Sequence, residues 1–385
     1  MMNAAPMLEG IKVVDLTSVV FGPYTTQVLS DFGADVIKVE PASGDAYRYS
    51  GKPAKSKAMS PGHIALNRGK KSVTLDLKDK ADHGVMLNML ADADIFIHNV
   101  REEAIKRLGL DYASIITVNP DIIYMHCVGF GSDGPYAGLQ AYDDVIQAAT
   151  GTTSLLSRVD GDDRPRFLPS LIADKVAGMN GAYAALAAVI HKLRTGRGQF
   201  VEVPMFEAFA NFMLKEHLAG KTFVPPNGTA CYDRQVDPLR QPFPTKDGHI
   251  VIVPYTLDSW GIIFDAIGMP EFMADERFAT PAGLIKNQGA LYEGLAAQTP
   301  LKTNDEWLAI MRHVNIPCMA VRDIEDILED PHLLETGFLN KREHPTEGTY
   351  FELREASSFS DWEAGQSDHA PLVGEHNAEI RGKYA

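Results

Sequence analysis

Short runs of β-branched and aliphatic residues alternate with amphipathic segments along the first half of the chain. Runs of this kind predict strands, and the longer segments between them predict helices. The expected strands cover residues 11–16, 36–39, 72–77, 95–98, 122–128 and 199–203, and the expected helices 23–31, 81–91, 104–107 and 112–118. Strands separated by helices imply a parallel sheet that is covered on both faces. The pattern therefore predicts an α/β fold with a Rossmann-like, doubly wound parallel sheet.

A long segment rich in alanine and glycine follows Pro169, and we expect it to form a helix over about residues 171–194. One face of this helix is made of small residues, which are Ala173, Ala177, Gly178, Gly181, Ala182, Ala185 and Ala188. Such a face allows a neighbouring backbone to approach closely. Asp174 lies in the first turns of the helix, where an acidic side chain ordinarily complements the helix dipole. Its position alone does not separate a structural role from a catalytic one.

The composition of the chain changes after about residue 224. The segment 224–228 reads Val-Pro-Pro-Asn-Gly, which is typical of a linker. A strand is expected at 249–253, a helix at 257–267, and further helices to about residue 313. We therefore predict a large domain over 1–224, completed by 331–385, and a smaller α+β domain formed by 225–330 with its linkers.

The charge balance narrows the range of partners. The 385 residues include 36 basic and 51 acidic side chains, which give a formal net charge of −15. So acidic a surface disfavours nucleic acids and anionic membranes. The first nine residues have no basic segment followed by a hydrophobic one, so we expect no signal peptide and a cytoplasmic protein. Cys127, Cys231 and Cys318 lie far apart without zinc-site spacing, so no metal is expected.

The first expected strand does not lead into a familiar phosphate-binding motif. The first expected strand is followed by Thr-Ser-Val-Val-Phe-Gly-Pro rather than GxGxxG, and neither GxxxxGK[ST] nor GxSxG occurs. Basic residues do gather in one region, at Arg68, Lys70, Lys71, Lys78, Arg101, Lys106 and Arg107. They form either a solvated face or a site for phosphates. We interpret His63, His98 and His126 as core or surface residues, and Cys127 as a buried strand thiol.

Several short motifs occur in a fixed order along nearly the whole chain. They are LEGIKVVDLT at 8–17 with GP at 22–23, DFGADVIKVEP at 31–41 with GD at 44–45, NRGKKS at 67–72, GFG at 129–131, and TGRGQ at 195–199. Together they resemble the family III CoA-transferases, which include formyl-CoA and carnitine CoA-transferases. The resemblance implies a homodimer of interlocked chains that binds coenzyme A as a substrate. It makes Asp174 the catalytic residue and predicts CoA contacts at Val20, Phe21, Leu75, Lys78, Asn99, Val100, Arg101, Arg107, Tyr142 and Asp143.

The resemblance also implies a reaction. CoA would pass from an acyl-CoA to a small carboxylic acid through an aspartyl anhydride and an aspartyl-CoA thioester on Asp174. We expect the helix N-terminus to help hold this carboxylate ionised. The chain has no GGGG segment, so any lid over the site is expected within 233–241.

Two alternatives remain from the sequence. The first is an α-methylacyl-CoA racemase or epimerase on the same fold, a subgroup that uses a histidine in a His-Asp-x-Asn-Tyr segment. Residues 141–145 here read Ala-Tyr-Asp-Asp-Val, so that general acid/base is missing. The second alternative is a non-catalytic CoA-binding protein.

Overall fold

The computed structural model describes residues 5–362 and 367–385. The chain divides into two compact units. Unit 1 comprises Met1–Thr153, Phe167–Lys215 and Pro331–Ala385, and unit 2 comprises Ser154–Arg166 and Glu216–Asp330. The expected small domain, 225–330, lies within unit 2. The main part of unit 2 begins earlier than the expected domain, at Glu216, near the end of helix α9 (Met205–His217). Unit 2 also includes the short segment Ser154–Arg166, which the sequence pattern did not assign to it.

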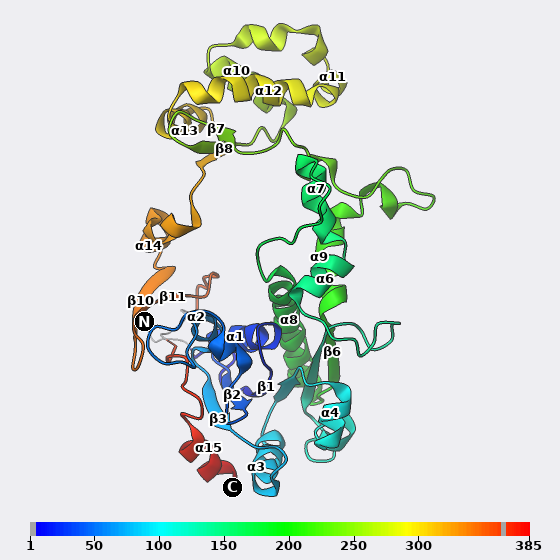
Figure 1. The fold of residues 1–385 in the computed structure, drawn as a ribbon, viewed down its shortest axis with the longest axis vertical. Helices are drawn as coiled ribbons and strands as arrows, with labels where there is room; N and C mark the ends of the chain where they lie inside the picture. Colours follow the sequence, from blue (N-terminus) through cyan, green and yellow to red (C-terminus); the bar gives the residue numbers. More distant parts are fainter. Residues whose placement is uncertain (1–4, 363–366) are drawn as a thin grey trace. The chain divides into compact units, whose positions relative to one another are not determined.

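Unit 1 is built on a six-stranded parallel sheet (Figure 1). Its strands are β1 (Lys12–Leu16), β2 (Asp35–Glu40), β3 (Lys71–Thr74), β4 (Ile95–His98), β5 (Ile123–Val128) and β6 (Phe200–Pro204). The order across the sheet is β3-β2-β1-β4-β5-β6, the order of a doubly wound sheet. Val13 of β1 pairs with Val36 on one side and with Ile95 on the other. The predicted α/β fold with a parallel sheet is confirmed.

Helices connect these strands. Those that the sequence pattern predicted are α1 (Phe21–Asp31), α3 (Lys80–Ala91), α4 (Glu102–Arg107), α5 (Tyr112–Ile115) and α8 (Ile172–Thr195). The short helices α2 (Pro61–Asn67) and α6 (Asp143–Ala149) were not predicted. Several begin at a side chain that accepts hydrogen bonds from the first turn. Asp79, for example, accepts from the amides of Ala81 and Asp82 at the start of α3. Helix α8 ends at Gly196, whose φ of 76° few residues other than glycine adopt.

The small-residue face of α8 lies against α1. A Cβ added to Gly178 would come within 2.8 Å of the Tyr24 side chain, and one added to Gly181 within 2.4 Å of the Thr25 hydroxyl. The Thr25 hydroxyl also donates a hydrogen bond to the Gly178 carbonyl at 3.0 Å. The sequence pattern of α8 is therefore explained by close backbone packing between two helices.

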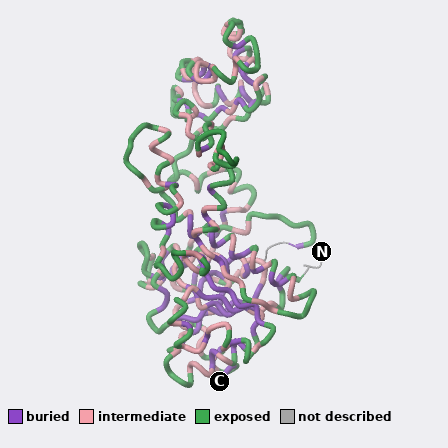
Figure 2. The backbone as a smooth tube through the Cα atoms, turned by 90° about the vertical axis from the view of Figure 1, so that its right-hand side faces the viewer, coloured by how far each residue is buried: buried purple, intermediate pink, exposed green. Residues whose placement is uncertain are grey.

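One hydrophobic core of unit 1 lies between the sheet and the helices α3, α4, α5 and α15 (Asn377–Tyr384). Met86 and Phe96 are fully buried there, and Ile380 of the C-terminal helix joins them. The sheet strands form the buried centre of this unit (Figure 2). The C-terminal segment also contributes α14 (Pro331–Glu335) and the hairpin of β10 (Leu339–His344) and β11 (Gly348–Leu353). The last 55 residues thus belong to unit 1.

Unit 2 combines a three-stranded antiparallel sheet with helices around its own core. Strand β8 (His249–Ile252) pairs with β7 (Phe243–Pro244) and β9 (Cys318–Ala320). The helices are α7 (Leu155–Asp160), α10 (Leu257–Ala266), α11 (Pro281–Lys286), α12 (Gln288–Gln298) and α13 (Asn304–His313). Trp260 and Trp307 are buried at the centre of this core, and the Trp307 indole donates to the Thr299 carbonyl at 2.9 Å. Among the described residues of both units, no helix is long and apolar enough to cross a bilayer.

Candidate active site

A cavity of about 910 Å³ opens in unit 1 at the carboxyl ends of β1, β4 and β5. Its rim includes residues 18–21 after β1, residues 99–103 after β4 and residues 128–130 at the end of β5. Strands β1 and β4 are neighbours in the sheet although they are not consecutive in sequence. Doubly wound sheets bind their ligands at this point, where the strand order reverses. The cavity therefore occupies the position that the fold favours for a ligand.

Asp174 lies in this cavity, in the first turn of α8. The side chain is buried, and the backbone amide of Phe21, at the start of α1, lies near its carboxylate. Burial, together with the nearby Asp143 carboxylate, raises the pKa of Asp174 to about 7, while the Phe21 amide acts in the opposite direction. We expected the helix N-terminus to hold Asp174 ionised. Burial instead outweighs the effect of the Phe21 amide, and the two protonation states are close in free energy near neutral pH.

The Asp143 carboxylate also lies at the N-terminus of α8, and protein groups donate hydrogen bonds to both of its oxygen atoms. Its Oδ1 accepts hydrogen bonds from the amides of Ala173 at 2.7 Å and Asp174 at 3.1 Å. Its Oδ2 accepts from the Gln147 side chain at 2.6 Å. Asp143 therefore caps α8 and does not line the cavity, because its oxygen atoms are occupied within the protein.

The other predicted CoA contacts fall into two groups. Those that line the cavity together with Asp174 are Val20, Phe21, Asn99, Val100, Arg101 and Tyr142. Leu75 lies instead in the hydrophobic core, after the edge strand β3. Lys78 and Arg107 are exposed and lie outside this cavity.

Asn99 joins two of the loops that form the rim. Its side-chain oxygen accepts from the Ser18 amide at 3.1 Å, and its side-chain nitrogen donates to the Ser18 carbonyl at 3.0 Å. This reciprocal pair ties the loop after β4 to the loop after β1. Both polar atoms of the Asn99 side chain are therefore engaged in holding the rim.

The basic residues that the sequence grouped together do not share one surface. Arg68 pairs with Asp31 at 2.8 Å, Lys70 pairs with Asp15 at 3.4 Å in a fully buried position, and Lys71 pairs with Glu379 at 2.8 Å. Lys106 lines the cavity and pairs with Glu102 on the same helix. Arg101 is exposed at the rim, and no carboxylate pairs with it in the described part of the chain. Arg101 and Lys106 are thus the members of the group that face the cavity.

One wall of the cavity is aromatic and was not predicted from the sequence; it is formed by Tyr112, Tyr124, His126 and Phe200. The ring of His126 stacks on that of His98, with 4.4 Å between centroids, and burial lowers the pKa of both imidazoles. A nitrogen of His98 lies 2.8 Å from the Tyr124 hydroxyl. The period of two along a strand places residues 124 and 126 on one face, and this signal was available in the sequence.

No group of three or more His, Cys, Asp or Glu side chains is arranged to hold a metal ion within residues 5–362 and 367–385.

The family model for CoA-transferase family III matches residues 8–377. The chain belongs to CoA-transferase family III. The predicted resemblance is confirmed, and the protein is a CoA-transferase. Similar curated proteins include the human succinyl-CoA:glutarate CoA-transferase, which is 29% identical and matches over 98% of this chain and 86% of its own length. The succinate–glutarate CoA-transferase of Agrobacterium fabrum is 30% identical, with 99% and 96% covered. The formyl-CoA:oxalate CoA-transferase of a Bradyrhizobium strain is 30% identical, with 97% and 92% covered.

Solved structures agree with this assignment. Rv3272 from Mycobacterium tuberculosis superimposes with a TM-score of 0.84 at 29% identity, covering 98% of this chain and all of its own. A CAIB/BAIF family protein from Brucella suis gives a TM-score of 0.83 at 29% identity, covering 99% of this chain and all of its own. The relatives differ in the acids that they are named for, so membership of the family does not define the acid pair of this transferase.

Proposed function

We propose that this transferase moves CoA from an acyl-CoA to a carboxylic acid through covalent intermediates on Asp174. The observation that carries the proposal is the placement of this carboxylate in the cavity, in the first turn of α8 and against the Phe21 amide. A carboxylate is a suitable nucleophile here, because the anhydride that it forms with an acyl group stays activated.

The reaction proceeds by exchange of acyl bonds. An oxygen of ionised Asp174 attacks the thioester carbonyl, the carbon–sulfur bond breaks, and CoA leaves as a thiolate. The thiolate then attacks the aspartyl carbonyl of the anhydride and releases the donor acid as a carboxylate. An acceptor carboxylate attacks the resulting aspartyl-CoA thioester, which forms a second anhydride and displaces CoA as a thiolate. This thiolate attacks the acceptor's carbonyl in the second anhydride and forms the new acyl-CoA. Asp174 is regenerated as a carboxylate, with no net proton or electron transfer.

Residues of the cavity have defined tasks in this proposal. The Phe21 amide orients the Asp174 carboxylate, since it lies near that group and favours its ionised form. Arg101 and Lys106 are the cations available at the rim for CoA phosphates. The aromatic side chains of the lining keep water from one side of the anhydride, which water would otherwise hydrolyse.

The proposal is tested by trapping the intermediate. The purified protein is incubated with a panel of acyl-CoAs, quenched with hydroxylamine and digested, and the modified peptides are mapped by mass spectrometry. The names of the relatives suggest succinyl-CoA, glutaryl-CoA and formyl-CoA for the panel, with succinate, glutarate and oxalate as acceptors. We expect a hydroxamate on Asp174 with at least one donor. An adduct on another residue, or none with any donor that is turned over, would refute the covalent role of Asp174.

The raised pKa of Asp174 predicts the pH dependence of its acylation. The ionised carboxylate is the nucleophile, so the single-turnover rate of adduct formation should rise with pH and level off above a midpoint near 7. Asp143→Asn removes a negative charge that raises this pKa. We therefore expect its midpoint to move to lower pH and its rate at pH 6 to exceed that of the unmodified protein.

A matched control separates charge from hydrogen bonding. Gln147→Ala removes the hydrogen bond between Gln147 and Asp143 but leaves the Asp143 charge in place. Its midpoint should stay near that of the unmodified protein. A midpoint that moves equally in both variants would show that the hydrogen bond, and not the Asp143 charge, sets the pKa of Asp174.

We also infer that the transferase is a homodimer, as the family resemblance predicts. Helix α8 carries an exposed apolar stripe made of Met179, Tyr183, Ile190 and Leu193, with exposed fractions of 46%, 64%, 55% and 75%. Their spacing places them on one side of the helix. Contiguous apolar surface of this kind is typical of an interface between protein chains. The interlocking of the two chains stays a prediction.

Light scattering coupled to size-exclusion chromatography tests the dimer. We expect twice the mass of one chain for the unmodified protein and a shift toward one chain mass for the double variant Ile190→Glu/Leu193→Glu. The exposed Val118, on the segment before β5, serves as a control, and Val118→Glu should leave the mass unchanged. A single-chain mass for the unmodified protein would exclude the dimer.

Two alternatives from the sequence are weaker after the comparisons. This chain has no histidine in the segment 141–145, where the racemases have the histidine that acts as general acid/base. His126, which does line the cavity, has a lowered pKa and is engaged with the Val100 carbonyl at 3.1 Å. The curated relatives named above are CoA-transferases, which argues against a non-catalytic CoA-binding protein.

A further inference from the structure

The loop between β1 and α1 contains an unusual backbone conformation at the edge of the cavity. Val19 has a φ of 72°, in the left-handed region that β-branched residues rarely adopt. Val19 and its neighbours Ser18, Val20 and Phe21 all line the cavity. Strained residues of this kind persist only where surrounding contacts hold them, and they concentrate at functional sites. The contacts that hold Val19 therefore indicate how the loop is fixed.

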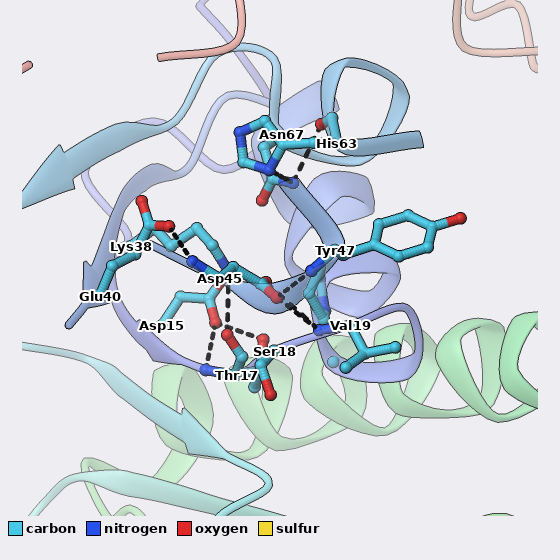
Figure 3. Close-up of polar contacts among 12 residues, drawn as sticks. Asp15, Thr17, Ser18, Val19, Lys38, Glu40, Asp45, Tyr47, His63 and Asn67 are labelled. Atoms are coloured by element: carbon cyan, nitrogen blue, oxygen red, sulfur yellow. Dashed lines mark hydrogen bonds and ion pairs between the residues drawn. The ribbon is translucent and has the colours of Figure 1, made fainter. Parts of the chain in front are cut away.

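Asp45 makes the contact that holds this residue (Figure 3). Both of its carboxylate oxygens accept from the Val19 amide, Oδ1 at 3.1 Å and Oδ2 at 3.2 Å. Oδ1 also accepts from the Tyr47 amide at 2.9 Å, so Asp45 caps the short 3₁₀ helix η1 (Ala46–Tyr49). One buried carboxylate thus joins the strained loop to a separate segment that follows β2.

Asp45 is itself fixed by buried charged groups. Lys38 of β2 pairs with its Oδ2 at 3.0 Å, and both side chains are almost completely buried. The same Lys38 ammonium donates to the Thr17 carbonyl at 2.9 Å, two residues before Val19. The Asp45 amide donates to Glu40 at 2.8 Å. Lys38 and Asp45 therefore hold the loop at two points, the Thr17 carbonyl and the Val19 amide.

The loop leads directly to the group that contacts Asp174. Phe21, two residues after Val19, lines the cavity together with Asp174, and its amide lies near the Asp174 carboxylate and lowers its pKa. The direction of that amide depends on the backbone angles of the residues just before it. A change at Val19 from the left-handed region to the extended region would redirect the chain that carries Phe21.

We propose that Asp45 is a positioning residue for the transferase reaction, which holds Val19 in its left-handed conformation so that the Phe21 amide meets the Asp174 carboxylate. The proposal rests on the covalent role proposed for Asp174. Asp45 touches neither Asp174 nor the cavity and acts through the backbone of the loop.

A rescue experiment distinguishes this role from a general contribution to stability. The rate of adduct formation on Asp174 is measured in single turnovers for Asp45→Ala, for Val19→Gly and for the double variant. We expect Asp45→Ala to slow acylation about 10- to 100-fold, because small displacements of a reacting group have effects of this size. Glycine adopts a positive φ without strain, so Val19→Gly in the Asp45→Ala background should recover several-fold of the lost rate. Asp45→Asn, which keeps one acceptor oxygen, should lie between the unmodified protein and Asp45→Ala, and it replaces Asp45→Ala if that variant does not fold.

Glu347 provides a matched control. It is also a buried carboxylate that accepts two backbone amides, from Lys55 at 2.8 Å and Ser56 at 3.0 Å, and it lies outside the cavity. Glu347→Ala should lower the thermal midpoint without changing the acylation rate. An equal loss of acylation in Glu347→Ala and Asp45→Ala, with no rescue by Val19→Gly, would overturn the positioning role.

Hydrogen–deuterium exchange gives a readout that does not depend on the reaction. The peptide that spans residues 17–22 should exchange faster in Asp45→Ala than in the unmodified protein, while peptides from β4 and β5 stay unchanged. Unchanged exchange in this peptide would refute the proposed hold on Val19, whatever the kinetics. An unmodified protein that forms no adduct with any acyl-CoA would refute the covalent function instead, and the exchange data would still decide whether Asp45 fixes the loop.

Discussion

Asp174→Ala is expected to abolish hydroxamate trapping and to slow CoA transfer by about 10⁴-fold or more, the size of effect seen when a nucleophile is removed. The carboxylate lies in the cavity near the Phe21 amide. In the described part of the chain, the carboxyl groups that line the same cavity belong to Glu102, Glu103, Asp111 and Glu202. None of them is placed at the start of α8, so none can take over the role through the same helix. Steady-state transfer between a donor identified by trapping and its acceptor acid measures the loss.

Asp174→Asn is the companion variant, because it keeps the size of the side chain and removes its charge. A carboxyl group whose pKa is higher in the folded chain than in the unfolded chain binds more protons when folded. Between the ordinary pKa of aspartate and about 7, its contribution to the stability of the folded chain therefore falls as pH rises. The stability of Asp174→Asn relative to the unmodified protein should therefore increase as pH rises through this range, and the variant should remain inactive throughout.

Thermal midpoints at pH 5 and pH 8 check this expectation. A lower midpoint for Asp174→Asn than for the unmodified protein at pH 8 would mean that the carboxylate stabilises the fold in its ionised form. Residual transfer within tenfold of the unmodified rate in both variants would exclude Asp174 as the nucleophile.

Arg48→Met is expected to lower the free energy of unfolding by about 3–5 kcal/mol, the range for breaking one side of a buried ion pair. Arg48 is fully buried, and its guanidinium contacts both oxygens of Glu40, at 2.7 Å through Nε and 2.6 Å through Nη2. Removal of Arg48 would leave the Glu40 carboxylate buried with the nearby Lys38 charge and with hydrogen bonds from the Ser72 hydroxyl and the Asp45 amide, but without its ion-pair partner. The arginine is also one reason why the pKa of Glu40 lies at about 2, so the loss should be largest at neutral pH and shrink as pH falls toward 2.

Urea unfolding of the full chain measures this loss, with Lys12→Met as the control. Lys12 pairs with Asp92 at a similar distance of 2.7 Å, but both side chains are 39% exposed. Such a surface pair contributes no more than about 1 kcal/mol. The double variant Arg48→Met/Glu40→Gln should be more stable than Arg48→Met alone, since it leaves no uncompensated buried charge. Similar effects for Arg48→Met and Lys12→Met would contradict the importance of burial.

Local sequence patterns were sufficient for much of the fold. The β-branched runs located the six strands of the parallel sheet, and the alanine-rich segment located α8 and its small-residue face. These features depend on periodicity and residue size along a continuous segment, which the sequence displays directly. The family motifs added the identity of Asp174 as the candidate nucleophile, which periodicity alone could not supply.

Contacts between distant residues could not be predicted in the same way. Lys70 was grouped with other basic residues near it in sequence, yet its partner Asp15 lies 55 positions away. Asp143 was assigned to CoA, but the fold brings it to the amide of Ala173, 30 positions later. The segment Ser154–Arg166 belongs to unit 2 although unit 1 flanks it on both sides. Each of these depends on which elements become neighbours in three dimensions.

The close contact between α1 and α8, which we call the seam, limits which positions can be varied when the acid preference of this enzyme is altered. Helix α1 begins at Phe21, whose amide contacts Asp174 near the start of α8, and Gly178 and Gly181 leave no room for a side chain between the two helices. The close approach of α1 to α8, and with it the placement of Phe21 near Asp174, therefore depends on two glycines that have no Cβ. Combinatorial libraries aimed at new donors or acceptors should leave positions 24, 25, 178 and 181 unchanged. Diversity is better directed at the aromatic wall, where Tyr112 and Phe200 border the cavity without supporting this seam.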